Sequence, residues 1–90
     1  MSLQSRMREK LMVSLNPTRL DVVNESHLHA GHGSSPGTGE SHFRVLIVSG
    51  DFVGKSRIER HRIVNDVLRD ELRDGVHALA IKATAPGEPT

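Results

Sequence analysis

Residues 50–83 read GDFVGKSRIERHRIVNDVLRDELRDGVHALAIKA and predict a turn, a helix and a strand in succession. Ser56 followed by Glu59 is a capping box, so the helix is expected to begin near Arg57. On a helical wheel one broad side of this helix is apolar and the other is charged. The apolar side carries Ile58, Ile63, Val64, Val67, Leu68 and Leu72, and the charged side carries Arg62, Asp66, Arg69, Asp70 and Arg73. Gly75 is expected to end the helix in a left-handed conformation. The strand then covers residues 77–83.

Working outward from this segment, the N-terminal half predicts one helix and two strands. Apolar residues recur at every fourth position from Leu3 to Leu15, and Asn16-Pro17 ends that helix. Residues 19–25 and 41–49 have strand composition. The order α-β-β-α-β lets the first two strands pair antiparallel, while the helical crossover returns the third strand parallel. We therefore predict an α/β chain of the α+β type, with a three-stranded mixed sheet and helices on one face.

Ninety residues with 36% apolar and 2% aromatic side chains predict one small domain with an aliphatic core. We assign residues 1–85 to that domain, residues 26–40 to a flexible loop rich in histidine and glycine, and residues 86–90 to a disordered tail. There is no cysteine, which excludes disulfides and thiolate chemistry from this chain alone. No signal peptide or long apolar run is found, so the expectation is a cytoplasmic protein that is monomeric when alone and makes no membrane contact.

Six histidines are the most informative feature, because imidazole ligates metals and titrates near neutrality. The loop sequence HLHAGH supplies His27, His29 and His32. A zinc or copper site there would need a fourth ligand from His42, Glu25 or Glu40. The alternative is a solvated loop that binds nothing.

Two other histidines lie near regular structure. Strand alternation places His77 on the same side as Leu79 and Ile81, at the rim of the sheet, where it could be half buried and still available to a ligand. The alternative for His77 is a rim histidine that bonds a backbone carbonyl. His61 falls between Leu68 and Leu72 on the wheel, which favours a packed structural role.

A basic cluster surrounds the start of the second helix, formed by Lys55, Arg57, Arg60 and Arg62. It could hold a phosphate or a nucleic-acid backbone, or it could be a solvated face in which Arg62 pairs with Asp66. Gly50 and Gly54 stand too close together for a Walker loop. With no G-x-S-x-G elbow either, no catalytic nucleophile is found, and the protein is not expected to be an enzyme.

Three stretches together resemble the BolA family: NESHLHAG at residues 24–31, GESHFRVLIVSGDFVGKSRIERHRIVN at residues 39–65, and ELRDGVHALAIKATAP at residues 71–86. The resemblance covers nearly the whole chain. It implies a fold like the class II KH domain. It also implies pairing with a monothiol glutaredoxin in a heterodimer that shares a bridging [2Fe-2S] cluster, in iron-sulfur cluster trafficking and in iron or redox regulation.

In that arrangement glutaredoxin and glutathione supply thiolates, this chain supplies imidazole, and the isolated chain holds no permanent cofactor. The family's C-terminal histidine ligand corresponds to His77. Its second ligand corresponds to His29, with His27 and His32 as nearby alternatives. Replacement of thiolate by imidazole on one iron is the ligation found in Rieske centres.

The sequence is also compatible with two other functions. Some BolA proteins are transcriptional regulators, which would assign Lys55, Arg57, Arg60 and Arg62 to DNA. The near-zero net charge of +1 and the lack of a G-x-x-G clamp count against DNA binding. The other possibility is a scaffold that docks a reductase partner without metal.

Overall fold

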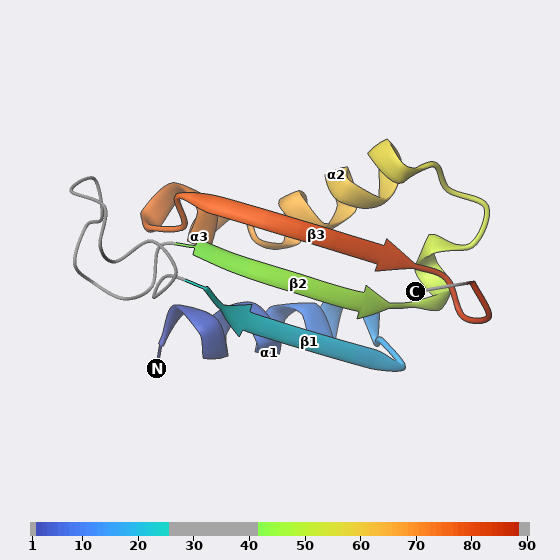
Figure 1. The fold of residues 1–90 in the computed structure, drawn as a ribbon, viewed down its shortest axis with the longest axis horizontal. Coiled ribbons are helices and arrows are strands. Elements are labelled where there is room, and N and C mark those ends of the chain that lie inside the picture. The colour runs from blue at the N-terminus through green and yellow to red at the C-terminus, as the bar shows by residue number, and fades with distance from the viewer. Residues whose placement is uncertain (1, 26–41, 89–90) are drawn as a thin grey trace.

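The fold is organised around a three-stranded sheet, shown in Figure 1. A computed structural model describes residues 2–25 and 42–88. Strand β1 comprises Arg19–Asn24, β2 comprises His42–Val48 and β3 comprises Ala78–Thr84. The strand order is β1-β2-β3, with β1 antiparallel and β3 parallel to the central strand. The predicted mixed sheet and its pairing are confirmed.

The helices α1 (Leu3–Leu15), α2 (Arg57–Val67) and α3 (Arg69–Asp74) pack on one face of this sheet. In Figure 1 they lie behind the strands, and the opposite sheet face is uncovered. Strand β2 shows the reason, because its alternate residues Phe43, Val45 and Ile47 are buried toward the helices while the others are half-buried or exposed. The helices therefore cover one face, as predicted.

The core is aliphatic apart from two phenylalanines. From α1 it receives Met7, Leu11 and Leu15, spaced at four residues as the sequence predicts. Phe43 is buried in β2, and Phe52 is buried in the short 3-10 helix η2 (Gly50–Phe52) that follows it.

Local capping explains where the helices begin and end. Ser56 Oγ accepts a hydrogen bond of 3.2 Å from the Glu59 amide, so the predicted N-cap of α2 is confirmed. In the residues that the structure describes, the Glu59 carboxylate makes no return bond to Ser56, so only half of the expected capping box forms. Helix α1 ends at Asn16, which adopts the left-handed conformation, just before Pro17.

The second predicted helix is interrupted, which the sequence did not indicate. Leu68 (φ −98°, ψ 15°) separates α2 from α3 and is itself fully buried. Its amide bonds to both Val64 and Asp66 carbonyls, a tightened final turn that lets α3 take its own direction. The charged side of α2 and α3 faces solvent, as predicted. The prediction that Ile58 belongs to the buried apolar side is wrong: Ile58 is 66% exposed, because the first turn of α2 lies beyond the sheet edge (Figure 1).

Gly75 ends α3, but the expected left-handed conformation is wrong. Its φ of 179° is ordinary extended backbone, and its amide bonds to the Glu71 carbonyl at 3.1 Å. A Cβ at this position would lie 3.2 Å from Cδ1 of Leu3. A side chain at position 75 would therefore require the Leu3 side chain in α1 to shift slightly.

Glu71 is a buried carboxylate that the sequence pattern did not single out. Its side chain has no solvent exposure. Lys10 Nζ donates to Oε1 at 2.9 Å, and Arg6 Nη2 approaches Oε2 to 3.0 Å without hydrogen-bond geometry. The contact with this carboxylate, chiefly its hydrogen bond, raises the pKa of Lys10. The cluster ties α1 to α3.

Residues 86–88, which the sequence assigned to a disordered tail, form a turn on the domain. Ala85 is buried and its amide bonds to Glu88 Oε1 at 2.9 Å. Glu88 in turn pairs with Arg60 in α2, so these residues are fixed at both ends of the turn. Within the described ranges 2–25 and 42–88, no helix is long and apolar enough to cross a membrane.

Candidate functional site

Two histidines meet at one end of the sheet. His77 immediately precedes β3, and His42 opens β2 beside it, because the parallel register pairs His42 with Ala78. Their ring centroids are 5.9 Å apart and their planes are tilted by 52°. His77 is exposed and His42 is half-buried. In the part of the chain that the structure describes, His77 bonds no backbone carbonyl, so its imidazole is available from solvent.

The predicted loop ligands His27, His29 and His32 lie outside the described residues, as does Glu40. The two chain ends that flank them are at the sheet end that carries His77. Glu25 donates its backbone amide to the His42 carbonyl at 2.8 Å, and its carboxylate pairs with Arg44 at 3.2 Å. The Glu25 carboxylate, considered above as a possible metal ligand, is therefore already paired with a guanidinium. Across residues 2–25 and 42–88, no three His, Asp or Glu side chains are grouped to hold a metal ion.

The approach of His42 to His77 was missed by sequence reasoning, which considered His42 only as a partner of the loop. The signal was present, since two parallel strands that start at residues 42 and 78 must begin at the same end of the sheet. His77 is also more exposed than the half-buried position expected from alternation, because it precedes the first paired residue of β3.

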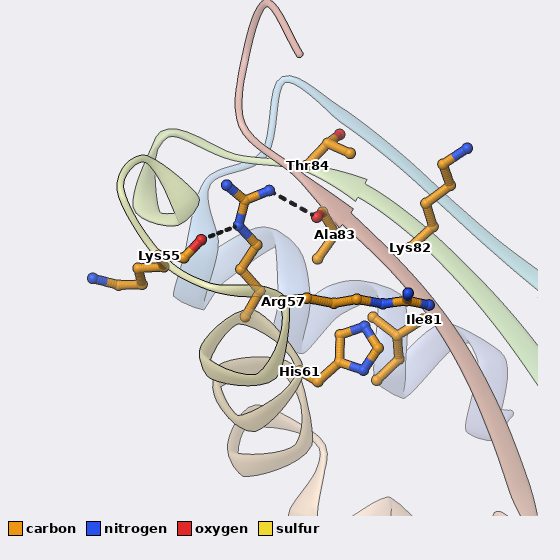
Figure 2. A pocket seen from close by; sticks show the side chains of 8 residues that line it. Lys55, Arg57, His61, Ile81, Lys82, Ala83 and Thr84 are labelled. Atoms are coloured by element: carbon orange, nitrogen blue, oxygen red, sulfur yellow. Dashed lines mark hydrogen bonds between the residues drawn. The ribbon is translucent and has the colours of Figure 1, made fainter. Parts of the chain in front are cut away.

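The predicted basic cluster lines a groove between α2 and β3, shown in Figure 2. The groove has a volume of about 570 Å³ and is open to solvent. Lys55 and Arg57 line its helix side, Ile81 and Ala83 its strand side, and Lys82 adds a further cation that sequence reasoning did not include. Arg62 is exposed but does not line the groove, and its expected ion pair with Asp66 is absent from the described part of the chain.

Arg60 is already occupied. Its guanidinium makes two bonds to the Glu88 carboxylate, at 2.6 and 2.8 Å, and donates to the Ala83 and Lys55 carbonyls at 3.1 and 2.9 Å. Its hydrogen bond lowers the pKa of Glu88 from 4.5 to about 2, aided by the Ala85 amide. The carboxylate in turn raises the pKa of Arg60. Arg60 is therefore a structural cation, which weakens its assignment to DNA.

His61 faces the strand across this groove. It is half-buried and lines the cavity with Ile81. Figure 2 shows its ring pointing from α2 toward the β3 side chains. The packed orientation expected from the helical wheel is therefore only partly realised, since one side of the ring stays open to the groove.

These features define a class of small α+β domains in which the helices cover one face of a mixed three-stranded sheet and histidines mark one sheet end. A family model described as BolA-like protein matches residues 11–88. The chain belongs to the BolA family.

Similar proteins agree with this assignment. The Sinorhizobium "Uncharacterized protein in cobS 5'region" is 55% identical over 91 residues, covering 100% of this chain and 98% of the relative. The solved structure of BolA1 from Arabidopsis thaliana has a TM-score of 0.85 at 45% identity and covers 97% of this chain and 95% of that one.

The BolA domain of SufE1 from Arabidopsis thaliana has a TM-score of 0.88 at 47% identity, covering 99% of this chain and 98% of that domain. The chain spans only 24% of the full SufE-like protein 1, with 49% identity over 87 residues that make up 92% of this chain. The same domain thus also exists as part of a longer protein.

Proposed function

We propose that this protein is a non-enzymatic cytoplasmic partner of a monothiol glutaredoxin and contributes histidine ligands to a [2Fe-2S] cluster that the two proteins share. Its role is then in cluster trafficking or assembly and in iron or redox regulation. The protein alone is a monomer without permanent cofactor. Partner, cluster and ligands are all part of the proposal, and they rest on family membership together with the histidine-bearing sheet end.

The observation that carries the proposal is the position of His77. Its imidazole is exposed just before the start of β3 and makes no hydrogen bond to a backbone carbonyl within the described residues. Neutral imidazole is a good ligand for iron, and a ligand offered to a second protein must be reachable from solvent. A histidine buried under the helices could not serve this role.

We assign the second ligand to His29, with His27 and His32 as alternatives. All three lie in the segment that joins Glu25 to His42, and both of those flanking residues are at the His77 end of the sheet. A histidine in this segment would therefore need to reach only the surroundings of Glu25 and His42, between which the segment is attached, in order to lie near His77. His42 is a further neighbour of His77, and we assign it a positioning role because its ring is held beside that of His77.

The donor set fits a shared cluster better than a complete site in one chain. The chain has no cysteine, so every thiolate must come from the partner and glutathione. When bound, the cluster would supply redox chemistry, and neutral imidazoles in place of thiolates raise its reduction potential. This chain's residues would bind one edge of it and exclude competing ligands there.

The test mixes the protein with a cluster-loaded monothiol glutaredoxin and follows the visible circular dichroism spectrum. We expect a new spectrum with the native chain and no such spectrum with His77→Ala. His61→Ala is the matched control, because it removes an imidazole from the groove between α2 and β3 and should leave the new spectrum intact.

Binding of apo-glutaredoxin, measured by calorimetry, separates docking from cluster ligation. His77→Ala should dock normally and fail only with the cluster. If the His77→Ala protein gives the native spectrum, the assignment of this ligand is wrong. If apo-glutaredoxin binds but the native chain leaves the spectrum of cluster-loaded glutaredoxin unchanged, a metal-free scaffold is the correct function.

A further inference from the structure

Among the residues that the structure describes, one backbone edge of strand β3 has no neighbouring strand. The sheet order β1-β2-β3 makes it an outer strand, so only one of its two edges is paired with β2. An unpaired edge presents a row of amides and carbonyls on which another extended chain can add. The groove described above lies along this edge, between β3 and α2 (Figure 2).

The residues that face outward along this edge follow from the hydrogen-bond pattern. The Thr84 carbonyl accepts from the Ser49 amide, so Thr84 bonds toward β2. Because successive residues of a strand bond to opposite sides, Leu79, Ile81 and Ala83 direct their amides and carbonyls away from β2. Of these groups, only the Ala83 carbonyl has a partner in residues 2–25 and 42–88.

At the Thr84 end of this edge, the side chains of Arg60 and Glu88 already bond to backbone groups that an added strand would otherwise bond. Arg60 donates to the outward carbonyl of Ala83, and Glu88 accepts from the amide of Ala85. The carboxylate of Glu88 lies against the guanidinium at 2.6 Å. The protein thus binds one of its own carboxylates where the groove ends, which indicates the kind of side chain that the surface accepts.

The charges along the remaining edge are positive. Arg57 extends from the helix side toward the strand, Lys55 lines the start of the helix side with its ammonium directed away from β3, and Lys82 projects from β3 to the other side of the sheet edge (Figure 2). All three are exposed, and none forms an ion pair in the described part of the chain. An extended chain placed along β3 would direct alternate side chains toward these two sides.

We infer that the groove between β3 and α2 binds an extended acidic peptide segment of a partner protein. The segment adds to the sheet as a fourth strand beside Leu79, Ile81 and Ala83, its carboxylates pair with Arg57 and Lys82, and Lys55 adds positive charge at the start of the groove. Backbone bonds supply a sequence-independent part of the affinity, and charge selects acidic side chains. The groove lies toward the Thr84 end of β3, away from His77, so this site is separate from the proposed cluster ligands.

A peptide fits this surface better than a nucleic acid. A nucleic-acid backbone has acceptors for cations but no amides to match the open carbonyls of Leu79 and Ile81. The most enclosed guanidinium of the cluster, Arg60, is already neutralised by Glu88. The net charge of +1 also provides little long-range attraction for a polyanion.

The experiment titrates the isotope-labelled full chain with a peptide of about eight residues, a usual strand length, in which Glu-Glu and Thr-Thr pairs alternate so that Glu side chains fall on both faces of the strand. Amide signals of Leu79, Ile81 and Ala83 should shift and become protected from hydrogen exchange. A peptide with Lys in place of Glu is the charge control. Two further peptides carry N-methyl groups on alternate residues, in opposite phases, and only the phase that blocks the β3-facing amides should abolish binding.

Charge-reversal variants test the same site from the protein side. Arg57→Glu and Lys82→Glu should each raise the dissociation constant of the acidic peptide about tenfold, because each change breaks a charge pair across the interface. Arg69→Glu, an exposed change on α3, is the matched control and should bind normally. Absence of acidic-peptide binding, equal effects of the two N-methyl phases, or binding of single-stranded DNA by these residues in its place would each overturn the inference. Cluster formation with glutaredoxin should be unchanged in Arg57→Glu, so the two proposals fail independently.

Discussion

The rings of His42 and His77 lie 5.9 Å apart, centroid to centroid, although the two residues belong to segments separated by a turn and two helices. The parallel pairing of β2 with β3 sets this distance, because it brings the first residue of one strand beside the residue that precedes the other. The arrangement gives one sheet end two imidazoles, one on the first residue of β2 and one on the residue before β3. A ligand contributed by His77 would therefore lie directly next to the paired part of the sheet.

The roles of the neighbouring histidines can be separated with two variants. We expect His29→Ala to weaken or alter the cluster spectrum with glutaredoxin, because it removes the proposed second ligand. His42→Ala should retain the spectrum but release the cluster faster to a chelator, since His77 loses the ring beside it. Visible circular dichroism and the rate of bleaching are the measurements.

Thermal melting of the apo-proteins is the control for His42→Ala, because His42 is half-buried at the start of a central strand. A well-folded His42→Ala protein that forms no cluster would assign the second ligand to His42. An unchanged spectrum with His29→Ala would remove His29 from the site and leave His27 and His32 to be tested in the same way.

The buried Glu71 predicts an asymmetric response to mutation. Glu71→Gln keeps the shape and an acceptor for Lys10 but loses the charge, and we expect the free energy of unfolding to fall by about 1–3 kcal/mol. Changing Arg6 and Lys10 together to Met should destabilise the protein more, because it leaves the carboxylate buried without a cation. Urea denaturation gives both values.

The reason for the asymmetry is exposure. The Arg6 and Lys10 side chains are 39% and 37% exposed, so water can solvate them when Glu71 is neutralised. Glu71 itself has no access to water. A Glu71→Gln protein less stable than the double Met variant would show that the two cations do not compensate the buried charge.

Most of the fold could be predicted from the sequence, because its signals are local. The four-residue spacing from Leu3 to Leu15, the Ser56 cap and the β-branched run before Ser49 each specify an element without reference to the rest of the chain. The break at Leu68 could not be predicted in this way, since it depends on how α2 and α3 pack against α1. The same holds for the close approach of the Leu3 side chain to Gly75, two residues that are distant in the sequence.

The candidate site was only partly predictable, for a similar reason. His77 and the basic residues can be picked out from the sequence by their chemistry. Their partners in space, however, are residues that lie far away in the sequence. Arg60 was assigned to a ligand because Glu88 lay in a presumed tail, and Lys82 was missed because it belongs to another element. The relationship to class II KH domains, inferred from resemblance, stays a prediction.

The cap of α2 gives a test of a local stability term. Ser56→Ala removes the hydroxyl that accepts from the Glu59 amide and should cost about 1 kcal/mol of unfolding free energy. Ser56→Gly should cost a few tenths of a kcal/mol, since glycine leaves the amide hydrated. Chemical denaturation distinguishes these values. Equal stability of Ser56→Ala and the native protein would show that water replaces the hydroxyl fully.

The pairing of Arg60 with Glu88 predicts a loss of stability in acid. The pKa of Glu88 is lowered from 4.5 to about 2, first by the Arg60 hydrogen bond and then by the Ala85 amide. A carboxylate with a lower pKa in the folded state stabilises the fold above its unfolded pKa and loses that contribution as protons bind. The contribution of Glu88 should therefore be complete above pH 4.5 and disappear as the pH falls to about 2.

Glu88→Gln should flatten the pH dependence of the urea midpoint in this window, because glutamine can accept from Ala85 but does not titrate. Glu9→Gln is the matched control: Glu9 is exposed and forms no ion pair in the described part of the chain, so its neutralisation should leave the slope unchanged. Equal slopes for Glu88→Gln and the native protein would show that the turn at residues 86–88 opens without a cost in stability. The Arg60 guanidinium would then be free for another anion.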